Sequence, residues 1–372
     1  MRPTLCPALL AILLSLTVAG AVSGCGLALG GTSRPGDAAP ASSRVAPPLA
    51  QTTPLDDPRA WDGVAEAVID AQVDPVSSDA VPRLPVTVTD AQGTEVTVTS
   101  ADRILALDVY GTLARTVYDL GLGDRLVGRD VSTQFSPADQ LPLVTQNGHD
   151  LAAEAILALD PTVILTDTSL GPWDVVLQLR DAGIPVVVLD SHRSLDDVAA
   201  LTRSTAAALG VPEQGRELAR RTQTRIDQAE QAIGRVAPAS EADRLRTVFL
   251  YVRGDAGVYY LFGEESGADD LIDALGLYDV AEEIGWNGMK PVTDEAIVAA
   301  QPDLVVMMTK GLASAGGVEG LLERLPALAN TPAGEHERFV TMADSQILGF
   351  GPDSAAVLNA LAVAVYSPEA LR

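Results

Sequence analysis

Two short motifs, far apart in the chain, carry the side chains with the clearest chemical potential. The first is residues 250–254 (LYVRG), where side chains two apart on an extended strand face the same way. Arg253 can therefore donate to the phenol oxygen of Tyr251 and favour its anion. The second is residues 147–150 (NGHD), where Asp150 is suited to cap the next helix and leaves the His149 imidazole free to point into a cleft. Tyr-x-Arg often arises by chance, and a lone histidine is more often a surface residue than a ligand, so the surrounding fold must decide what these motifs do.

The elements that would position the histidine motif begin near Leu84. Alternating β-branched and polar residues around the turn at 90–93 (DAQG) predict a β-hairpin over 85–100. Short apolar runs then predict buried parallel strands at 104–108, 163–166 and 186–190, alternating with helices at 112–120, 151–159 and 173–182. This alternation predicts an α/β lobe over residues 84–211.

The second half of the chain repeats the pattern and contains the tyrosine motif. Its predicted strands are 247–252, 304–308 and 339–342, and its predicted helices are 268–275, 294–300 and 354–366. One segment recurs, because residues 154–165 (EAILALDPTVIL) and 295–306 (EAIVAAQPDLVV) share the spacing from glutamate to proline. Each copy is predicted as a helix, a proline turn and a strand. Two related lobes are the economical explanation, the second spanning 238–372.

Between the lobes, residues 212–236 predict one long helix. Pro212 suits its first turn, no further proline interrupts it, and charged residues outnumber the sparse apolar ones. At 1.5 Å per residue it would be about 37 Å long, enough to bridge two domains. The expected fold is bilobal α/β, with two Rossmann-like lobes joined by this single helix, for which we allow residues 212–237.

Residues 1–24 have the features of a signal peptide. Arg2 precedes an apolar run too short to span a membrane, and residues 22–25 (VSGC) resemble the lipobox of bacterial lipoproteins. The resemblance implies cleavage before Cys25, acylation of its thiol and anchorage to the outer face of the cell membrane. A cleaved signal peptide with an incidental cysteine is the alternative.

The segment after the cysteine is expected to be unstructured. Residues 25–60 are rich in Gly, Ala, Pro, Ser and Thr and poor in long apolar side chains, which predicts a flexible tether. Residues 61–83 are a linker of uncertain structure, in which 64–73 could form a short helix.

Composition excludes some classes of function. With 50 acidic and 25 basic residues and a pI near 4.3, the surface repels phosphate backbones, so nucleic acid is not an expected partner. Solubility is the ordinary explanation of such acidity. No HExxH, GxSxG or paired Cys/His metal spacing occurs, and we do not expect an enzyme.

With its two lobes, one connecting helix and a glutamate on an outer helix of each lobe, the chain from about residue 84 to 372 resembles the class III, helical-backbone binding proteins of ABC importers. These proteins serve importers of vitamin B12, iron siderophores and haem. The resemblance implies a monomer that docks Glu154 and Glu295 on arginines of a permease, which works with a cytoplasmic ATPase. The alternative is that both glutamates only stabilise the positive ends of their helices.

Within that class the two motifs are most similar to the haem-binding lipoproteins of Gram-positive importers. The resemblance implies that His149 and Tyr251 bind haem iron from opposite faces, with Arg253 favouring the phenolate. A ferric porphyrin does leave two axial positions that suit such ligands. Met289 precedes the repeated helix of the second lobe as His149 precedes that of the first. It could pack on the porphyrin or replace an axial ligand, although core packing is the commoner role of methionine.

Other candidates and another cargo stay open. Tyr110 and Trp173 follow predicted strands, where α/β lobes bind ligands, but packing explains them equally well. His192 could also face the cleft, and Arg129 or Lys290 could meet the haem propionates. Aromatic residues make up only 4% of the chain, which leaves a ferric siderophore or a corrinoid such as vitamin B12 as the alternative ligand.

Overall fold

The computed structural model describes residues 44–372. The expected signal peptide, the lipidation site Cys25 and most of the expected tether lie outside the described residues. No helix in the described part is long and apolar enough to cross a membrane.

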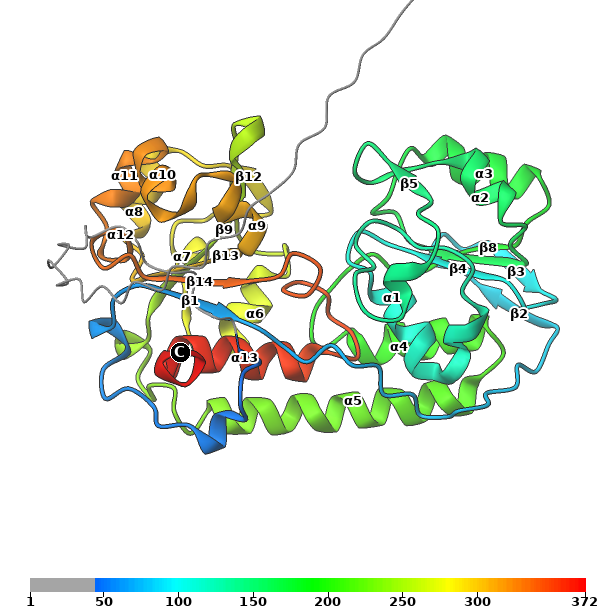
Figure 1. Ribbon diagram of the computed structural model, residues 1–372, viewed down its shortest axis with the longest axis horizontal. Coiled ribbons are helices and arrows are strands. Elements are labelled where there is room, and N and C mark those ends of the chain that lie inside the picture. Colours follow the sequence, from blue (N-terminus) through cyan, green and yellow to red (C-terminus); the bar gives the residue numbers. More distant parts are fainter. Residues whose placement is uncertain (1–43) are drawn as a thin grey trace, which may run out of the picture. The chain divides into compact units, whose positions relative to one another are not determined.

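The first lobe contains the predicted hairpin and a three-stranded parallel sheet (Figure 1). The hairpin pairs β2 (Val86–Thr89) with β3 (Glu95–Val98), and the Asp90 carboxylate closes its turn by accepting from the backbone N–H of Thr94 at 2.8 Å. The sheet has the order β4-β7-β8 and consists of β4 (Ile104–Leu107), β7 (Val163–Thr166) and β8 (Val186–Val188). All three strands are buried along their whole length, as their continuous apolar sequence predicts.

Four helices and a small ribbon complete this lobe. They are α1 (Thr112–Val117), α2 (Ala153–Ala158), α3 (Trp173–Asp181), α4 (Val198–Ala208) and the ribbon β5 (Thr145–Gln146) with β6 (Asp150–Leu151). The strands, hairpin and helices predicted for this lobe are all present, with ends that differ by a few residues.

The second lobe is built on a larger mixed sheet of order β1-β14-β13-β9-β10-β12, with β11 paired to β9. Its strands are β1 (Val64–Ala67), β9 (Arg246–Arg253), β10 (Val258–Phe262), β11 (Tyr278–Asp279), β12 (Met289–Pro291), β13 (Leu304–Met308) and β14 (Phe339–Met342). Its helices are α6 (Ala268–Ala274), α7 (Val280–Glu283), α8 (Asp294–Ala300), α9 (Thr309–Ser314), α10 (Gly317–Arg324), α11 (Pro326–Ala329), α12 (Pro332–Glu335) and α13 (Ser354–Tyr366). The bilobal α/β class predicted from the sequence is confirmed.

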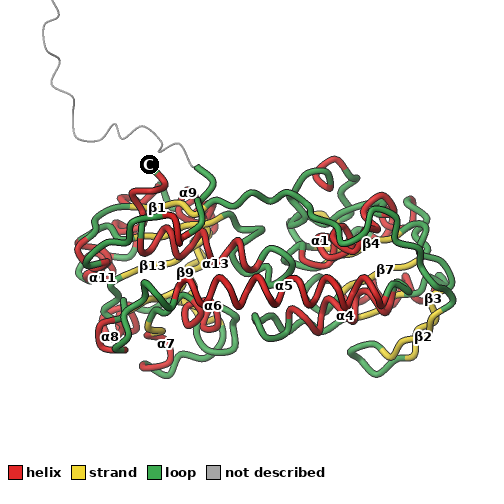
Figure 2. Tube along the Cα trace, turned by 90° about the horizontal axis from the view of Figure 1, so that it is seen from below, coloured by secondary structure: helices red, strands yellow, loops and turns green. Residues whose placement is uncertain are grey.

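The predicted connecting helix is α5 (Pro212–Ile233), which ends three residues before the predicted helix end at residue 236. It packs on α4 of the first lobe and on α13 of the second: Figure 1 shows it running beneath both, and Figure 2, seen from below, shows it spanning the two lobes. Its few apolar side chains, among them Leu218, Ile226 and Ile233, are buried, while its charged side chains line the outer surface. The sparse apolar stripe is therefore enough to dock it on two partners.

The segment before the first lobe differs from the prediction. Residues 64–67 form strand β1 and not a helix: they pair in parallel with β14, and the alternate residues Ala65 and Ala67 are buried. Part of the expected tether is also packed, since Leu49 is 2% exposed and lies in the core with α13. The folded part therefore starts before residue 60, because Leu49 is buried against elements from the other end of the chain.

This segment forms a second connection between the lobes. After β1 the chain crosses along α5, where Asp74 pairs with Arg225 at 2.8 Å. The buried Arg115 of α1 then donates to the carbonyls of Ala71 and Gln72 at 3.0 and 2.7 Å. The first lobe is thus tied to the second by α5 and by an extended strap, residues 68–83.

Candidate functional site

Tyr251 lies on β9 of the second lobe and is held from two sides. Its ring stacks on Phe262 of the neighbouring strand, with ring centroids 5.8 Å apart. The guanidinium carbon of Arg253 lies 4.5 Å from the centre of the Tyr251 ring. The side chain is half-buried at the edge of the core, so its ring is fixed.

Arg253 does not donate to the Tyr251 oxygen as expected. It donates to Asp344 at 3.0 Å, and the described residues show no hydrogen bond between the arginine and the phenol. Two residues apart on a strand, the guanidinium reaches over the ring and not to its tip, and Asp344 then holds it there.

Aromatic side chains on one face of the sheet form a wall beside Tyr251. Tyr260 pairs with Tyr251 across the strands, Phe262 pairs with Phe249, and Met289 of β12 pairs with Phe262. Paired residues share one face of a sheet, so these side chains lie together. Phe249, Tyr251, Tyr260 and Phe262 thus place four aromatic residues on one face of the sheet. The aromatic residues in 258–262 (VYYLF) are a sequence signal for this wall.

Met289 belongs to this wall and not to the core. Its side chain is 55% exposed, which excludes the core-packing alternative. The next residue, Lys290, pairs with Leu261 and lies on the other face of the sheet, with its ammonium group 5.7 Å from the Trp286 ring.

His149 is the first lobe's contribution and sits at the tip of the turn between β5 and β6. Asn147 and Gly148 take φ values of 49° and 94°, a tight turn that suits these two residue types. The imidazole is exposed to solvent, but neighbouring atoms displace part of its water. This desolvation, and then the charge of Arg253, lower the pKa of His149, while Asp150 opposes them. Arg253 of the second lobe therefore contributes to the electrostatic environment of His149.

The expected capping role of Asp150 is wrong. The residue pairs with Gln146 in the β5–β6 ribbon, and the residue that precedes α2 is Ala152, which has no capping side chain. The ribbon, and not a helix cap, orients His149.

Glu154 and Glu295 occupy matching places on α2 and α8. Both are exposed in the first turn of their helices, and within residues 44–372 neither has a hydrogen-bond or ion-pair partner. Thr293 caps α8 through its hydroxyl at 3.2 Å, so Glu295 is not needed for that role.

The remaining candidates have local partners. Trp173 packs in the first lobe's core with Arg180 6.0 Å from its ring, and Arg129 donates to the carbonyl of Asp130 at 3.2 Å. His192 bonds to Asp197 at 2.6 Å, and this hydrogen bond raises the pKa of His192. His336, the third histidine of the chain, makes a similar contact with Asp62 at 2.5 Å. These contacts explain the side chains without a ligand.

Tyr110 lies at a cavity that residues of both lobes line. It lines this cavity together with Arg115 and Phe135 of the first lobe and Gln346 and Phe350 of the second. His149 and Tyr251 do not line this cavity, so it is a separate feature from the pair of motifs.

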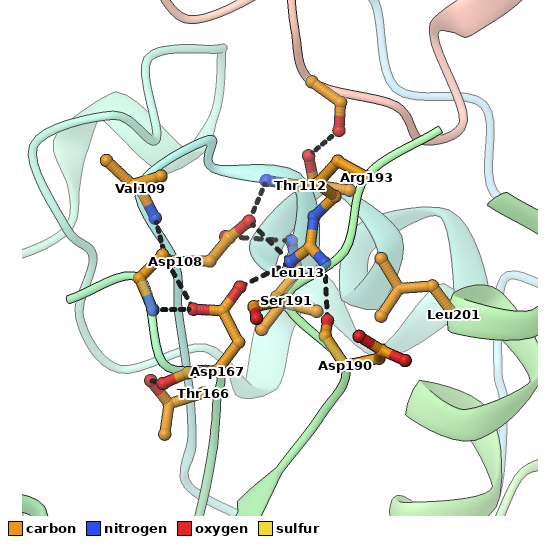
Figure 3. Close-up of polar contacts among 12 residues, drawn as sticks. Asp108, Val109, Thr112, Leu113, Thr166, Asp167, Asp190, Ser191, Arg193 and Leu201 are labelled. Atoms are coloured by element: carbon orange, nitrogen blue, oxygen red, sulfur yellow. Dashed lines mark hydrogen bonds and ion pairs between the residues drawn. The ribbon is translucent and has the colours of Figure 1, made fainter. Parts of the chain in front are cut away.

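A buried acidic cluster lies beside Tyr110 and was missed in the sequence (Figure 3). Arg193 lies 2.6 Å from Asp167 and 3.5 Å from Asp108, and its guanidinium carbon is 5.3 Å from the centre of the Tyr110 ring. Asp108 also accepts from the backbone of Leu113 at 3.1 Å. Burial, and then the charge of Asp130, raise the pKa of Asp108. Asp108 directly follows β4, and Asp167 directly follows β7. Their positions at the ends of parallel strands are the sequence signal that could have identified this cluster.

Comparisons with known proteins agree with this architecture. The periplasmic binding protein family matches residues 109–345. The solved structure of the heme binding protein HmuT is 39% identical, with a TM-score of 0.80, and the match covers 84% of this chain and 99% of HmuT. The periplasmic heme-binding protein RhuT from Roseiflexus sp. RS-1 is 34% identical, with a TM-score of 0.66, over 73% of this chain and all of RhuT.

Two curated relatives are more distant. The ABC transporter substrate-binding lipoprotein YvrC of Bacillus subtilis is 24% identical over 76% of this chain and 86% of its own length. A vitamin B12-binding protein of Pectobacterium carotovorum is 22% identical over 55% of this chain and 70% of its own length. The resemblance stated from the two motifs is confirmed, and the chain belongs to the periplasmic binding protein family of extracytoplasmic substrate-binding proteins.

Proposed function

We propose that this chain is the substrate-binding protein of an ABC importer and binds ferric haem between His149 and Tyr251. The observation that carries the proposal is the geometry at Tyr251, whose ring is stacked on Phe262 and covered by Arg253, the residue whose charge also lowers the pKa of His149. The likeness to HmuT supports it, since solved variants of that protein replace a histidine, a tyrosine or an arginine by alanine.

The side chains suit the chemistry of a ferric porphyrin. Iron in haem accepts a phenolate oxygen and a neutral imidazole nitrogen in its axial positions. The guanidinium of Arg253 lies over the Tyr251 ring, and desolvation together with the charge of Arg253 lowers the pKa of His149, which favours the neutral imidazole that iron binds. The wall formed by Tyr260, Phe262 and Met289 offers apolar side chains on which the ring could pack. The chain binds and releases its cargo without changing it.

A corrinoid is the second candidate, favoured by the vitamin B12-binding relative. The test is an absorbance titration of the protein from residue 44, which retains the docked Leu49, with ferric haem and with cyanocobalamin. We expect a saturating Soret shift at one haem per chain, which Tyr251→Phe alters. Tyr259→Phe is the matched control, because Tyr259 packs on the opposite face of the sheet. A flat haem titration with saturable cobalamin binding would replace haem by a corrinoid.

We also propose that Cys25 carries the lipid anchor and holds the protein at the outer face of the cell membrane. The lipoprotein named among its relatives supports this. Cys25→Ser should release the protein into the medium, and mass spectrometry of the wild-type protein should find acyl chains on the first mature residue. Retention of the Cys25→Ser variant at the membrane would contradict the proposal.

Docking of Glu154 and Glu295 on permease arginines is a further part of the proposal. Both carboxylates are exposed and unpaired within the described residues, which leaves them available. Changing both to glutamine should leave the haem titration intact and reduce haem uptake by cells. We expect a monomer, which light scattering of the haem-bound protein would test.

A further inference from the structure

The outer helices α2 and α8 share more than a glutamate. One turn after each glutamate stands an exposed aliphatic side chain: Leu157 on α2, which is 38% exposed, and Val298 on α8, which is 57% exposed. These residues occupy the same position in the two copies of the repeated segment. The described residues contain other exposed aliphatic side chains, but no other two stand at matching positions of the repeat.

The geometry of a helix places each glutamate and its aliphatic neighbour on one face, since residues three apart lie side by side. The following residue is an exposed alanine in both helices, Ala158 and Ala299, while Ile156 and Ile297 point inward. Each helix thus presents the same outer surface: a free carboxylate, an apolar side chain and a small residue that permits close approach. Figure 1 shows each helix on the side of its lobe away from α5.

We propose that Leu157 and Val298 are apolar anchors of the permease-docking surface, each inserting beside the glutamate of its own helix. The inference rests on the proposed function and extends it. The partner must present an arginine next to a shallow apolar recess, and it must present them twice. A two-fold symmetric permease does this, because its two copies offer the same recognition feature to the two lobes.

A scattered surface leucine or valine needs no explanation by itself. Here the apolar side chain recurs at the one position where it can share a partner with an unpaired carboxylate. A later pair of the repeat, Asp160 and Gln301, shares the same left-handed backbone but not the same charge. The match at Leu157 and Val298 is therefore a feature of the exposed surface and not only of the repeated backbone. Apolar contact gives an attraction that salt does not screen, unlike the glutamate contacts.

The experiment measures the affinity of the full-length lipoprotein for its permease–ATPase complex in nanodiscs. The double variant Leu157→Gln with Val298→Thr should bind the complex roughly tenfold more weakly, with the loss persisting at high salt. Glu154→Gln with Glu295→Gln should lose affinity mainly at low salt. Leu177→Gln on α3 and Val64→Thr on β1 are matched controls, exposed at 45% and 42%, and should bind as the wild type does.

A second pair, Ala158→Arg with Ala299→Arg, places bulky cations on the same faces and should abolish docking while melting temperature and haem titration stay unchanged. Undiminished affinity in both double variants would overturn the inference and leave the importer function standing. A wild-type protein that binds neither haem nor the permease would instead overturn the proposed function itself.

Discussion

The two lobes hold their halves of the proposed haem site in different ways. Tyr251 lies within a strand, stacked on Phe262 and covered by Arg253, which Asp344 fixes in turn. His149 sits at the tip of a short turn, exposed, and in the described chain no side chain is hydrogen-bonded to it. One ligand is built into a sheet, and the other is carried on a loop.

The difference indicates that the two lobes have different roles in haem binding and release. A preorganised ligand loses little conformational freedom on binding, so more of its interaction energy appears as affinity. A ligand on a turn must be ordered and can also be withdrawn without disturbing a core. We infer that the second lobe carries most of the haem affinity and that the first lobe provides the contact that is broken on release.

The largest effect should come from Tyr251→Phe. It removes the iron-binding oxygen but keeps the ring stacked on Phe262, so the fold should survive. We expect haem affinity to fall at least about 100-fold, or about 2.7 kcal/mol, measured by Soret titration against a competing haem acceptor. An affinity loss smaller than that of His149→Ala would reverse the division between the lobes.

His149→Ala should have a smaller effect on affinity and a larger one on release. The variant retains the phenolate and the aromatic wall, so we expect a loss of roughly tenfold, about 1.4 kcal/mol. Stopped-flow transfer to apomyoglobin should show that this loss lies in the dissociation rate. An unchanged dissociation rate would show that the imidazole does not hold the cargo. His192→Ala is the control, since the His192 imidazole is hydrogen-bonded to Asp197.

The sequence was sufficient for elements that are continuous apolar runs. β13, β14, α8 and α13 have the predicted bounds because each is a run of apolar residues or an amphipathic repeat between clear turn signals. β1 was missed because it has four residues and its partner, β14, lies at the other end of the chain. A strand of that kind has no local signal and depends on a sheet edge formed elsewhere.

The same distinction applies to the site. The types and spacing of Tyr251 and Arg253 were visible, but the position of the guanidinium depends on Asp344, which is 91 residues away in the sequence. Asp150 looked like a helix cap because the β5–β6 ribbon, which takes it instead, has only two residues in each strand. Local patterns identified the chemical groups, and long-range contacts decided how they are used.

The electrostatic link between the lobes gives a third, smaller effect. Desolvation and the charge of Arg253 lower the pKa of His149, whereas the Asp197 hydrogen bond raises that of His192. In an NMR titration of the haem-free protein, His149 should therefore titrate below pH 6.5 and His192 above it. Arg253→Leu removes a nearby positive charge, so the His149 midpoint should move upward while that of His192 stays. An unmoved His149 midpoint would mean that the two motifs do not face each other.

The smallest effect should come from Met289, the outermost member of the aromatic wall. Its thioether is 55% exposed on an edge strand, so it can cover only part of a bound ring. Met289→Ala should weaken haem binding roughly threefold, about 0.6 kcal/mol, through lost apolar contact. Lys290→Ala, which changes the opposite face of the same strand, should leave the titration unchanged. If Met289→Ala instead alters the position of the Soret band as strongly as His149→Ala does, the thioether binds the iron. The second lobe would then supply an axial ligand from β12 as well as from β9.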